Sequence, residues 1–245
     1  MGLTGRQKKT IVVSVLYLIT LFVSTHIPIP KIVYKAEVSD KWLHFLAYMN
    51  LFFLLWFSLS PEKKADWRKP AVWLIFLGVI ICGGVDEISQ PYTGRTCDFW
   101  DFTADAKGVS AGLIIVTFLT FWPSLLAVWA ISILGMATLI SADLSKIAPI
   151  LDAVYHVLAY AGLTLIWGQL INLYLLPRTI IRRLLLMISL PLGLMFFVKV
   201  SSMLLGKYFT TMAMLLSGGA IIVAAIAMWL SGRKRYQEPF LAKGV

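Results

Sequence analysis

Long apolar runs are the feature that most restricts how this sequence can fold. Hydrophobic residues make up 59 % of its 245 positions and charged residues only 14 %, whereas soluble domains carry about 25 % charged residues. Crossing the hydrocarbon of a bilayer takes about 20 residues of helix, and the runs reach that length. Backbone groups in lipid must be satisfied within the segment, so such runs form helices. The sequence therefore predicts an all-α, polytopic transmembrane helix bundle.

Eight spanning helices are predicted, in two halves of four. Charged or helix-breaking segments such as "PIPK", "SPEKKADWRKP" and "LPRTIIRR" separate several of the runs. Pro123 is expected to divide the run 109–142 into two helices joined by a tight turn. The predicted helices cover residues 10–28, 42–60, 70–88, 103–122, 123–142, 149–177, 183–206 and 209–231.

The basic residues indicate how the chain is oriented. With the N-terminus in the cytoplasm, fourteen of the 22 Lys and Arg residues fall on the cytoplasmic side, and nine of the 12 acids fall on the other. Cytoplasmic loops are enriched in Lys and Arg, so both termini are expected in the cytoplasm. The basic clusters lie between apolar spans, which fits a lipid bilayer as partner and argues against nucleic-acid binding.

An internal repeat suggests how the two halves are related. The segment "DKWLHFLAYMNL" (40–51) matches "DAVYHVLAYAGL" (152–163) in its Asp, His and Tyr positions. We expect two four-helix halves in parallel orientation, 1–122 and 123–245, as in duplicated transporter folds. The second half lacks the acids of the first, with Ser201 and Ser202 near the positions of Asp86 and Glu87, and is expected to be a degenerate copy.

Polar residues concentrate in "GGVDEISQPYTGRTCDFWDFTADAKG" (83–108), which holds five of the 12 acids. Spacings of three and four place residues on one helix face, and such spacings occur at 40–44, 86–90 and 98–105. The predicted topology brings these three stripes to one membrane face, where they would line an outward-facing pocket. The candidate site comprises Asp40, His44, Asp86, Glu87, Gln90, Arg95, Asp98, Asp101 and Asp105.

Several chemistries fit this set, beside the simpler alternative that the acids form a solvated outer loop. Carboxylates around His44 are suited to a divalent ion. His44 with a carboxylate from Asp86, Glu87 or Asp98 is suited to acid/base catalysis. Arg95 is suited to clamping a phosphate or carboxylate, with Asp40, Gln90, Asp101 and Asp105 as further ligand-binding residues. Phosphate loops, nucleophile elbows and dinucleotide fingerprints do not occur in the sequence.

Three motifs in residues 10–122 resemble the VanZ-like family of bacterial membrane proteins: "SDKWLHFLAY", "VDEISQ" and "GRTCDFWDFTADAKGVSAG". Asp105 departs from the family pattern, in which asparagine is expected. The family is named after a teicoplanin-resistance determinant, so the resemblance implies the cell envelope and the bacterial inner (cytoplasmic) membrane.

The resemblance and the polar residues together suggest three functions. The first is binding of a lipid-linked or cell-wall precursor, or of a glycopeptide antibiotic that acts on it. The alternative is an intramembrane hydrolase or transferase acting on lipid-phosphate or glycan substrates. Transport is disfavoured, because the ionisable residues gather at one face and no span is visibly interrupted near its middle.

Overall fold

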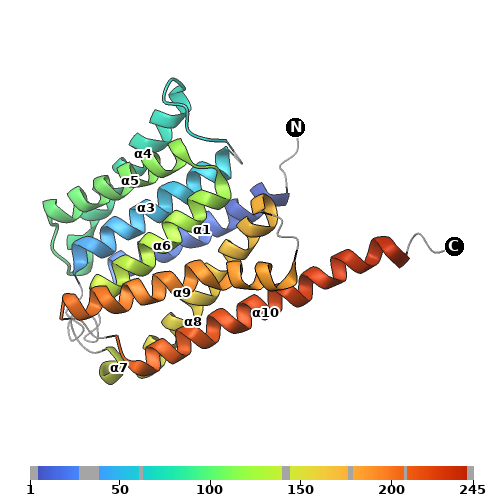
Figure 1. The fold of residues 1–245 in the computed structure, drawn as a ribbon. Coiled ribbons are helices and arrows are strands. Elements are labelled where there is room, and N and C mark those ends of the chain that lie inside the picture. The colour runs from blue at the N-terminus through green and yellow to red at the C-terminus, as the bar shows by residue number, and fades with distance from the viewer. Residues whose placement is uncertain are drawn as a thin grey trace. The chain divides into compact units, whose positions relative to one another are not determined.

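The computed structural model describes residues 5–27, 39–60, 63–139, 144–175, 179–206 and 209–241, and within these ranges the chain forms helices and no strands (Figure 1). The chain divides into two compact units, Met1–Gly135 and Met136–Val245. The division falls within one helix, α6. The predicted duplication into halves 1–122 and 123–245 stays a prediction.

The described part of the first unit contains four long helices and most of a fifth. They are α1 (Gly5–His26), α3 (Asp40–Leu59), α4 (Pro70–Ser89), α5 (Phe99–Phe118) and α6 (Phe121–Leu139), with a 3-10 turn, η1 (Gln90–Thr93), after α4. The second unit contains α7 (Leu144–Ile147), α8 (Pro149–Leu170), the π-helical segment η2 (Ile171–Leu175), α9 (Ile180–Leu204) and α10 (Thr211–Leu241). The predicted helix ends at residues 28, 142 and 177 lie outside the described residues.

Among the described residues, six helices are long and apolar enough to cross a membrane: α1, α3, α4, α8, α9 and α10. They identify the chain as a multi-pass membrane protein. The all-helical architecture is therefore confirmed, and six of the eight predicted spans correspond to helices of sufficient length and apolarity. Of the other two, α5 carries Asp101, Asp105 and Lys107, and the apolar part of α6, Phe121–Ala137, is shorter.

The turn between α5 and α6 is present, but it precedes Pro123. The helix α5 ends at Phe118, and Leu119 and Thr120 connect it to α6. Pro123 lies in the first turn of α6, where the helix has no earlier carbonyl for the proline ring to displace. The expectation that Pro123 itself divides the run is therefore wrong by a few residues.

Small residues decide how α3 and α5 pack in the first unit. A Cβ on Gly108 would overlap the Phe45 carbonyl, and a Cβ on Gly112 would lie 3.0 Å from that of Phe52. Only glycine lets the two backbones approach so closely, as at small-residue interfaces between membrane helices. The same contact turns the polar residues of α5 towards α3.

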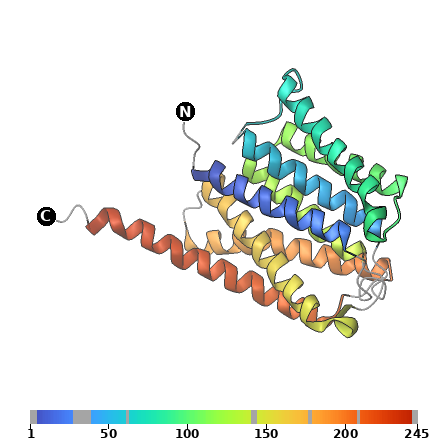
Figure 2. The ribbon, with the colours of Figure 1, turned by 180° about the vertical axis from the view of Figure 1, so that it is seen from behind.

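Two further helices lie along α3. One of them, α1, runs beside α3 (Figure 2). Its Ser14 hydrogen-bonds to the Ser58 hydroxyl at 2.8 Å, and its Tyr17 donates to the Ala47 carbonyl at 3.0 Å. On α6, Ser132 accepts a hydrogen bond from the Asn50 side chain at 3.2 Å. As a result α3 is the central helix of the unit, with most of its apolar residues buried.

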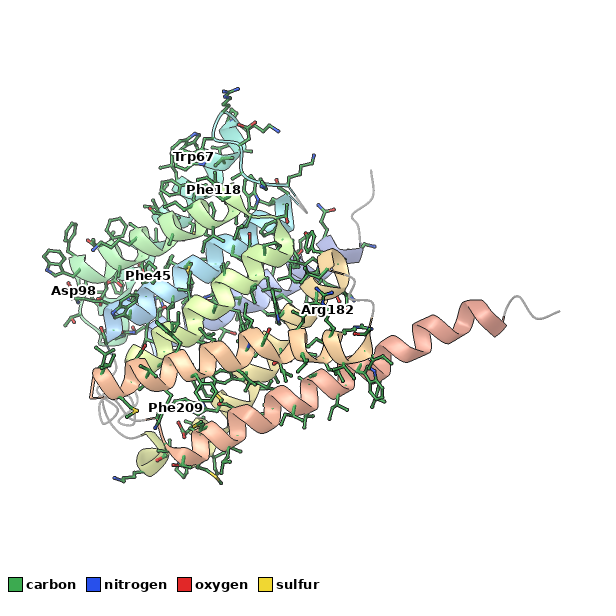
Figure 3. The ribbon with its side chains drawn as sticks, viewed as in Figure 1. Phe45, Trp67, Asp98, Phe118, Arg182 and Phe209 are labelled. Atoms are coloured by element: carbon green, nitrogen blue, oxygen red, sulfur yellow. The ribbon has the colours of Figure 1, made fainter. Side chains whose placement is uncertain are left out.

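The two ends of the first unit differ in chemistry. Asp98 lies at the start of α5, and Trp67 and Phe118 lie at its opposite end (Figure 3). There the Trp67 indole donates to the Thr117 hydroxyl at 2.7 Å. Tryptophan is enriched at membrane–water interfaces, and the exposed Trp100 lies at the acidic end, so tryptophan marks both ends of α5 and the acids mark one.

The second unit packs α8 against α9 and α10. Its apolar core includes Ile171, Met187 and Ala225, each at most 2 % exposed. The Trp167 indole ties α8 to α9 by donating to the Leu186 carbonyl at 2.7 Å.

Candidate functional site

His44 lies at the centre of the polar cluster in the first unit. It is only 5 % exposed, and its Nδ1 lies 2.9 Å from Oδ1 of Asp105, which is fully buried on α5. Glu87 on α4 places its Oε1 3.7 Å from the same nitrogen. An ionised carboxylate only accepts hydrogen bonds, so Nδ1 donates to Asp105. Three helices thus meet at one imidazole.

The other ring nitrogen of His44 faces two further carboxylates. Its Nε2 lies 3.9 Å from Oδ1 of Asp40 and 3.9 Å from Oδ2 of Asp101. Both separations exceed the length of a hydrogen bond. Asp40 is one turn earlier on α3, and Asp101 is one turn before Asp105 on α5, so helical geometry alone aims both at the ring.

Glu87 joins α4 to the loop that follows it. Its Oε1 accepts from Nε2 of Gln90 at 2.8 Å, and its Oε2 accepts from the backbone N–H of Asp98 at 3.1 Å. Gln90 is fully buried and Glu87 is 2 % exposed. These bonds fix the loop between α4 and α5 over the cluster.

Asp98 belongs to the cap of α5 and not to its helical face, which corrects the predicted stripe from Asp98 to Asp105. Its Oδ1 accepts from the Trp100 N–H at 2.8 Å, as an N-cap residue does. Its Oδ2 accepts from Lys41 Nζ at 2.8 Å, and Lys41 also donates to Asp101 at 3.0 Å. The bond from Lys41, then that from the Trp100 N–H, lowers the pKa of Asp98.

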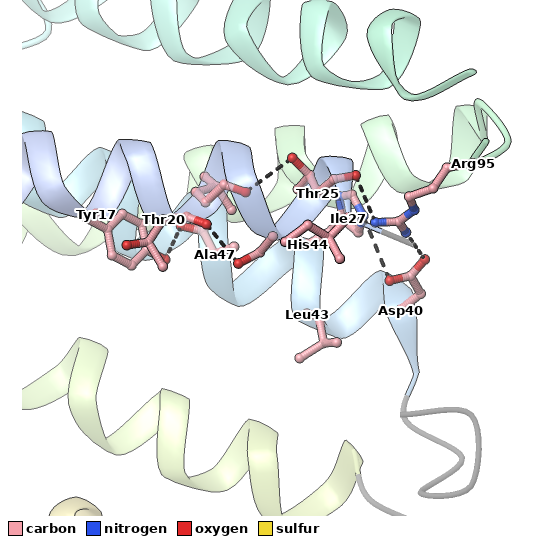
Figure 4. A pocket seen from close by; sticks show the side chains of 11 residues that line it. Tyr17, Thr20, Thr25, Ile27, Asp40, Leu43, His44, Ala47 and Arg95 are labelled. Carbon is pink, nitrogen blue, oxygen red and sulfur yellow. Dashed lines mark hydrogen bonds and ion pairs between the residues drawn. The ribbon is translucent and has the colours of Figure 1, made fainter. Parts of the chain in front are cut away.

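Arg95 holds the loop against two helices. One guanidinium nitrogen donates to the Thr25 carbonyl at 3.1 Å, and another donates to Oδ2 of Asp40 at 3.2 Å (Figure 4). Two guanidinium nitrogens of Arg95, the predicted anion clamp, therefore already donate hydrogen bonds within the protein. Arg95 also lines a pocket beside the cluster.

Asp86 connects to α1 through residues that the sequence analysis did not select. Its Oδ1 accepts from the Thr25 hydroxyl at 2.7 Å and lies 3.6 Å from Nδ1 of His26. His26 Nε2 lies 2.8 Å from the Ser89 hydroxyl. The sequence signal that could have identified these residues is the polar segment "STH" (24–26), which ends the first apolar run on the same membrane face as the acids.

A pocket of about 490 Å³ opens beside the cluster, between α1 and α3. Asp40, His44 and Arg95 line its polar end, and Tyr17 lies at the other end (Figure 4). Apolar side chains, including Leu21 and Leu43, form the wall between them. The pocket is therefore amphipathic along its length.

The structure brings all nine predicted site residues together in the first unit. Six of them are buried rather than solvated, at 6 % exposure or less: His44, Asp86, Glu87, Gln90, Asp101 and Asp105. The reading of the acids as a solvated outer loop does not fit this burial, and the expected wet pocket is limited to the side where Asp40, His44 and Arg95 line the cavity. Lys41, Thr25 and His26 complete the cluster and were missed.

The second unit contains a reduced version of the same arrangement. His156 Nδ1 lies 3.2 Å from the Ser217 hydroxyl, a pair 61 residues apart, as His44 and Asp105 are. Asp152 Oδ1 lies 3.5 Å from His156 Nε2. When His44 is aligned with His156, and Asp105 with Ser217, the position of Glu87 corresponds to Lys199 and not to Ser202.

Comparisons with known proteins identify no relative. No protein-family model, curated protein or solved structure matches the chain.

Proposed function

We propose that this chain is a VanZ-like protein of the bacterial cytoplasmic membrane whose first unit binds a lipid-linked envelope ligand. The observation that carries the proposal is the amphipathic pocket between α1 and α3. Its polar end has the charged groups of Asp40, His44 and Arg95, and its wall has Leu21 and Leu43. A ligand with an anionic headgroup and an apolar chain matches both parts.

The size and charge of the pocket support this class of ligand. A volume of about 490 Å³ lies within the range of roughly 300–1,000 Å³ typical of small-molecule sites. The planar guanidinium of Arg95 suits phosphate and carboxylate oxygens. The motifs around His44 and Arg95 also resemble the VanZ-like family, which extends the proposal to cell-wall precursors and to glycopeptides that act on them. The basic-residue count supports an outward-facing pocket with both termini in the cytoplasm.

Lipid retention tests the proposal. The full-length protein is purified in detergent with a polyprenyl phosphate as probe, and native mass spectrometry measures the bound fraction. Leu43→Trp fills the apolar wall and Arg95→Lys removes the planar fork, so both should lower the bound fraction several-fold. Leu74→Trp is the matched control, because Leu74 is 72 % exposed on α4 and does not line the pocket.

Equal retention by wild type, Leu43→Trp and Leu74→Trp would show that the lipid binds elsewhere, and the proposal would fall. The link to glycopeptides has its own readout. Expression of the wild-type chain in a susceptible bacterium should raise the inhibitory concentration of teicoplanin, and expression of Leu43→Trp should not.

A second candidate function is an intramembrane hydrolase or transferase. The pair of His44 and Asp105 at 2.9 Å favours it, because a carboxylate behind an imidazole fixes the tautomer needed for general-base catalysis. With a polyprenyl diphosphate as substrate, release of inorganic phosphate that is lost in His44→Gln would identify this activity. Binding without turnover would leave the ligand-binding function alone.

A further inference from the structure

We propose that His44, Asp40 and Asp101 form a divalent-cation site at the polar end of the pocket. One ligand atom from each of the three residues lies within 4.8 Å of the others. The inference concerns the ion alone and does not depend on which lipid or glycan the pocket binds.

The tautomer of His44 leaves the required nitrogen free. In the neutral ring with Nδ1–H donating to Asp105 at 2.9 Å, the form that a metal ion would bind, the lone pair is on Nε2. A histidine that binds a metal through one nitrogen typically donates its other N–H to a carboxylate, which orients the ring and increases its basicity. Asp105 has that supporting position, and it is fully buried.

The distances suit ligands of one ion better than hydrogen bonds. Bonds from Zn²⁺ to nitrogen or oxygen are about 2.0–2.2 Å and are arranged tetrahedrally, so two ligand atoms on one ion lie about 3.3–3.6 Å apart, a few tenths of an ångström less than the separations found here. The two Nε2–oxygen separations, to Asp40 and to Asp101, are both 3.9 Å. His44 is nine-tenths buried or more, and within the described residues no hydrogen bond to its Nε2 occurs.

The second oxygen of each carboxylate is already occupied, which orients the first. Arg95 donates to Oδ2 of Asp40 at 3.2 Å, and Lys41 donates to Oδ1 of Asp101 at 3.0 Å. The oxygens that face Nε2 are the other ones, Oδ1 of Asp40 and Oδ2 of Asp101. Both ligands are thus held by cations that lie outside the site.

The charge balance of the cluster also favours a cation. Six carboxylates gather in it: Asp40, Asp86, Glu87, Asp98, Asp101 and Asp105. Among the described residues, two permanently charged cations, Lys41 and Arg95, contact them. Two buried carboxylate oxygens, Oδ2 of Asp86 and Oδ2 of Asp105, have no hydrogen-bond partner among the residues that the structure describes. Uncompensated charge at membrane depth costs several kcal/mol, and a divalent ion offsets it.

One imidazole nitrogen with two carboxylate oxygens indicates the class of ion. Imidazole suits Zn²⁺ and the other transition ions, and carboxylates suit Mn²⁺ and Mg²⁺, so a mixed set favours Mn²⁺ or Zn²⁺. His44 and Asp40 also line the pocket, so coordination positions on that side face the pocket. There the ion would contact an anionic headgroup.

The second unit supplies an internal control. Asp152 and His156 repeat the first two ligands, with 3.5 Å between Oδ1 and Nε2. The register set by the pair of His156 and Ser217 places Ala213 at the position of Asp101, and Ser217 replaces the supporting carboxylate. This reduced set lacks the third ligand, so we expect it not to hold the ion.

Manganese binding tests the site directly. The full-length protein in detergent, treated with chelator and desalted, is titrated with Mn²⁺, and electron paramagnetic resonance measures free ion. We expect about one strong site per chain, displaced by Zn²⁺. Asp101→Asn should weaken binding at least tenfold, and Asp105→Asn, which removes only the supporting carboxylate, by about 10–100-fold. Asp152→Asn should bind as the wild type does.

The conservative variant Asp101→Glu, which keeps the carboxylate, should retain more binding than Asp101→Asn. Asp40→Asn, at a partly exposed position, is the second ligand variant should Asp101→Asn fail to fold, as judged by thermal unfolding. The absence of a strong Mn²⁺ or Zn²⁺ site in the wild type would overturn the inference. Unchanged binding in folded Asp101→Asn or Asp40→Asn, or loss of binding in Asp152→Asn, would also overturn it. Lipid retention is measured separately, so failure of one proposal is distinguishable from failure of the other.

Discussion

Replacing Gly108 by alanine should push apart the two helices that assemble the site. The added Cβ would lie 3.0 Å from the Met49 nitrogen and would overlap the Phe45 carbonyl oxygen. Both are backbone atoms of α3, so no side-chain rotation relieves the contact. The helices must separate, and Asp105, one turn before Gly108, moves away from His44.

The size of the effect follows from two opposing terms. Overpacking destabilises a protein by about 1–3 kcal/mol, and a clash with backbone atoms is expected at the upper end of that range. Replacing glycine by alanine within a helix stabilises the helix by about 0.5–1 kcal/mol. The free energy of unfolding should therefore fall by about 2 kcal/mol. Gly78→Ala is the matched control, because no atom lies within 4 Å of its added Cβ. That variant should gain about 0.5–1 kcal/mol.

Thermal unfolding in detergent, followed by tryptophan fluorescence, measures both variants. At about 2–4 °C per kcal/mol for a chain of this size, Gly108→Ala should lower Tm by about 4–8 °C, and Gly78→Ala should raise it slightly. If Gly108→Ala unfolds at the wild-type temperature, or if the two variants lose stability equally, the close approach of α3 and α5 is not what holds the unit together.

Three further outcomes are expected. After replacement of the two native cysteines, single cysteines at Lys64 and Gly94 should react with impermeant thiol reagents from the cytoplasm and from outside, respectively, and reversed labelling would contradict the topology. Substituting His44 by alanine should lower stability by about 1–3 kcal/mol in the same assay, because the buried Asp105 carboxylate loses its hydrogen-bond donor; a change well below about 1 kcal/mol would show that this pair is not coupled to folding. The pKa of Asp98 is lowered in the folded state, so its contribution to stability is present above the unfolded pKa near 3.9 and is lost as pH falls through the lower folded value. Lys41→Met should therefore reduce the dependence of unfolding on pH below about pH 4, and an unchanged acid profile would show that Lys41 does not stabilise the charged form.

Residues on one helix face could be predicted from the sequence, and the predictions about them agree with the structure. Asp40 and His44 are four apart on α3, and Asp101 and Asp105 are four apart on α5, so their shared faces follow from helical periodicity alone. Asp98 shows the limit of that reasoning. Its spacing continues the pattern, but its backbone is extended, and its side chain caps the helix.

The class of the protein follows from three features of the sequence: apolar runs of membrane-spanning length, the segments that separate them, and the concentration of acids near residues 83–108. These properties are local, because the need to satisfy backbone hydrogen bonds in lipid acts within each segment. The tertiary structure alone decided that the acids surround His44, because that depends on how closely Gly108 lets two backbones approach. It also brought Thr25 to Asp86 across 61 residues, and no periodicity within either helix carries that information.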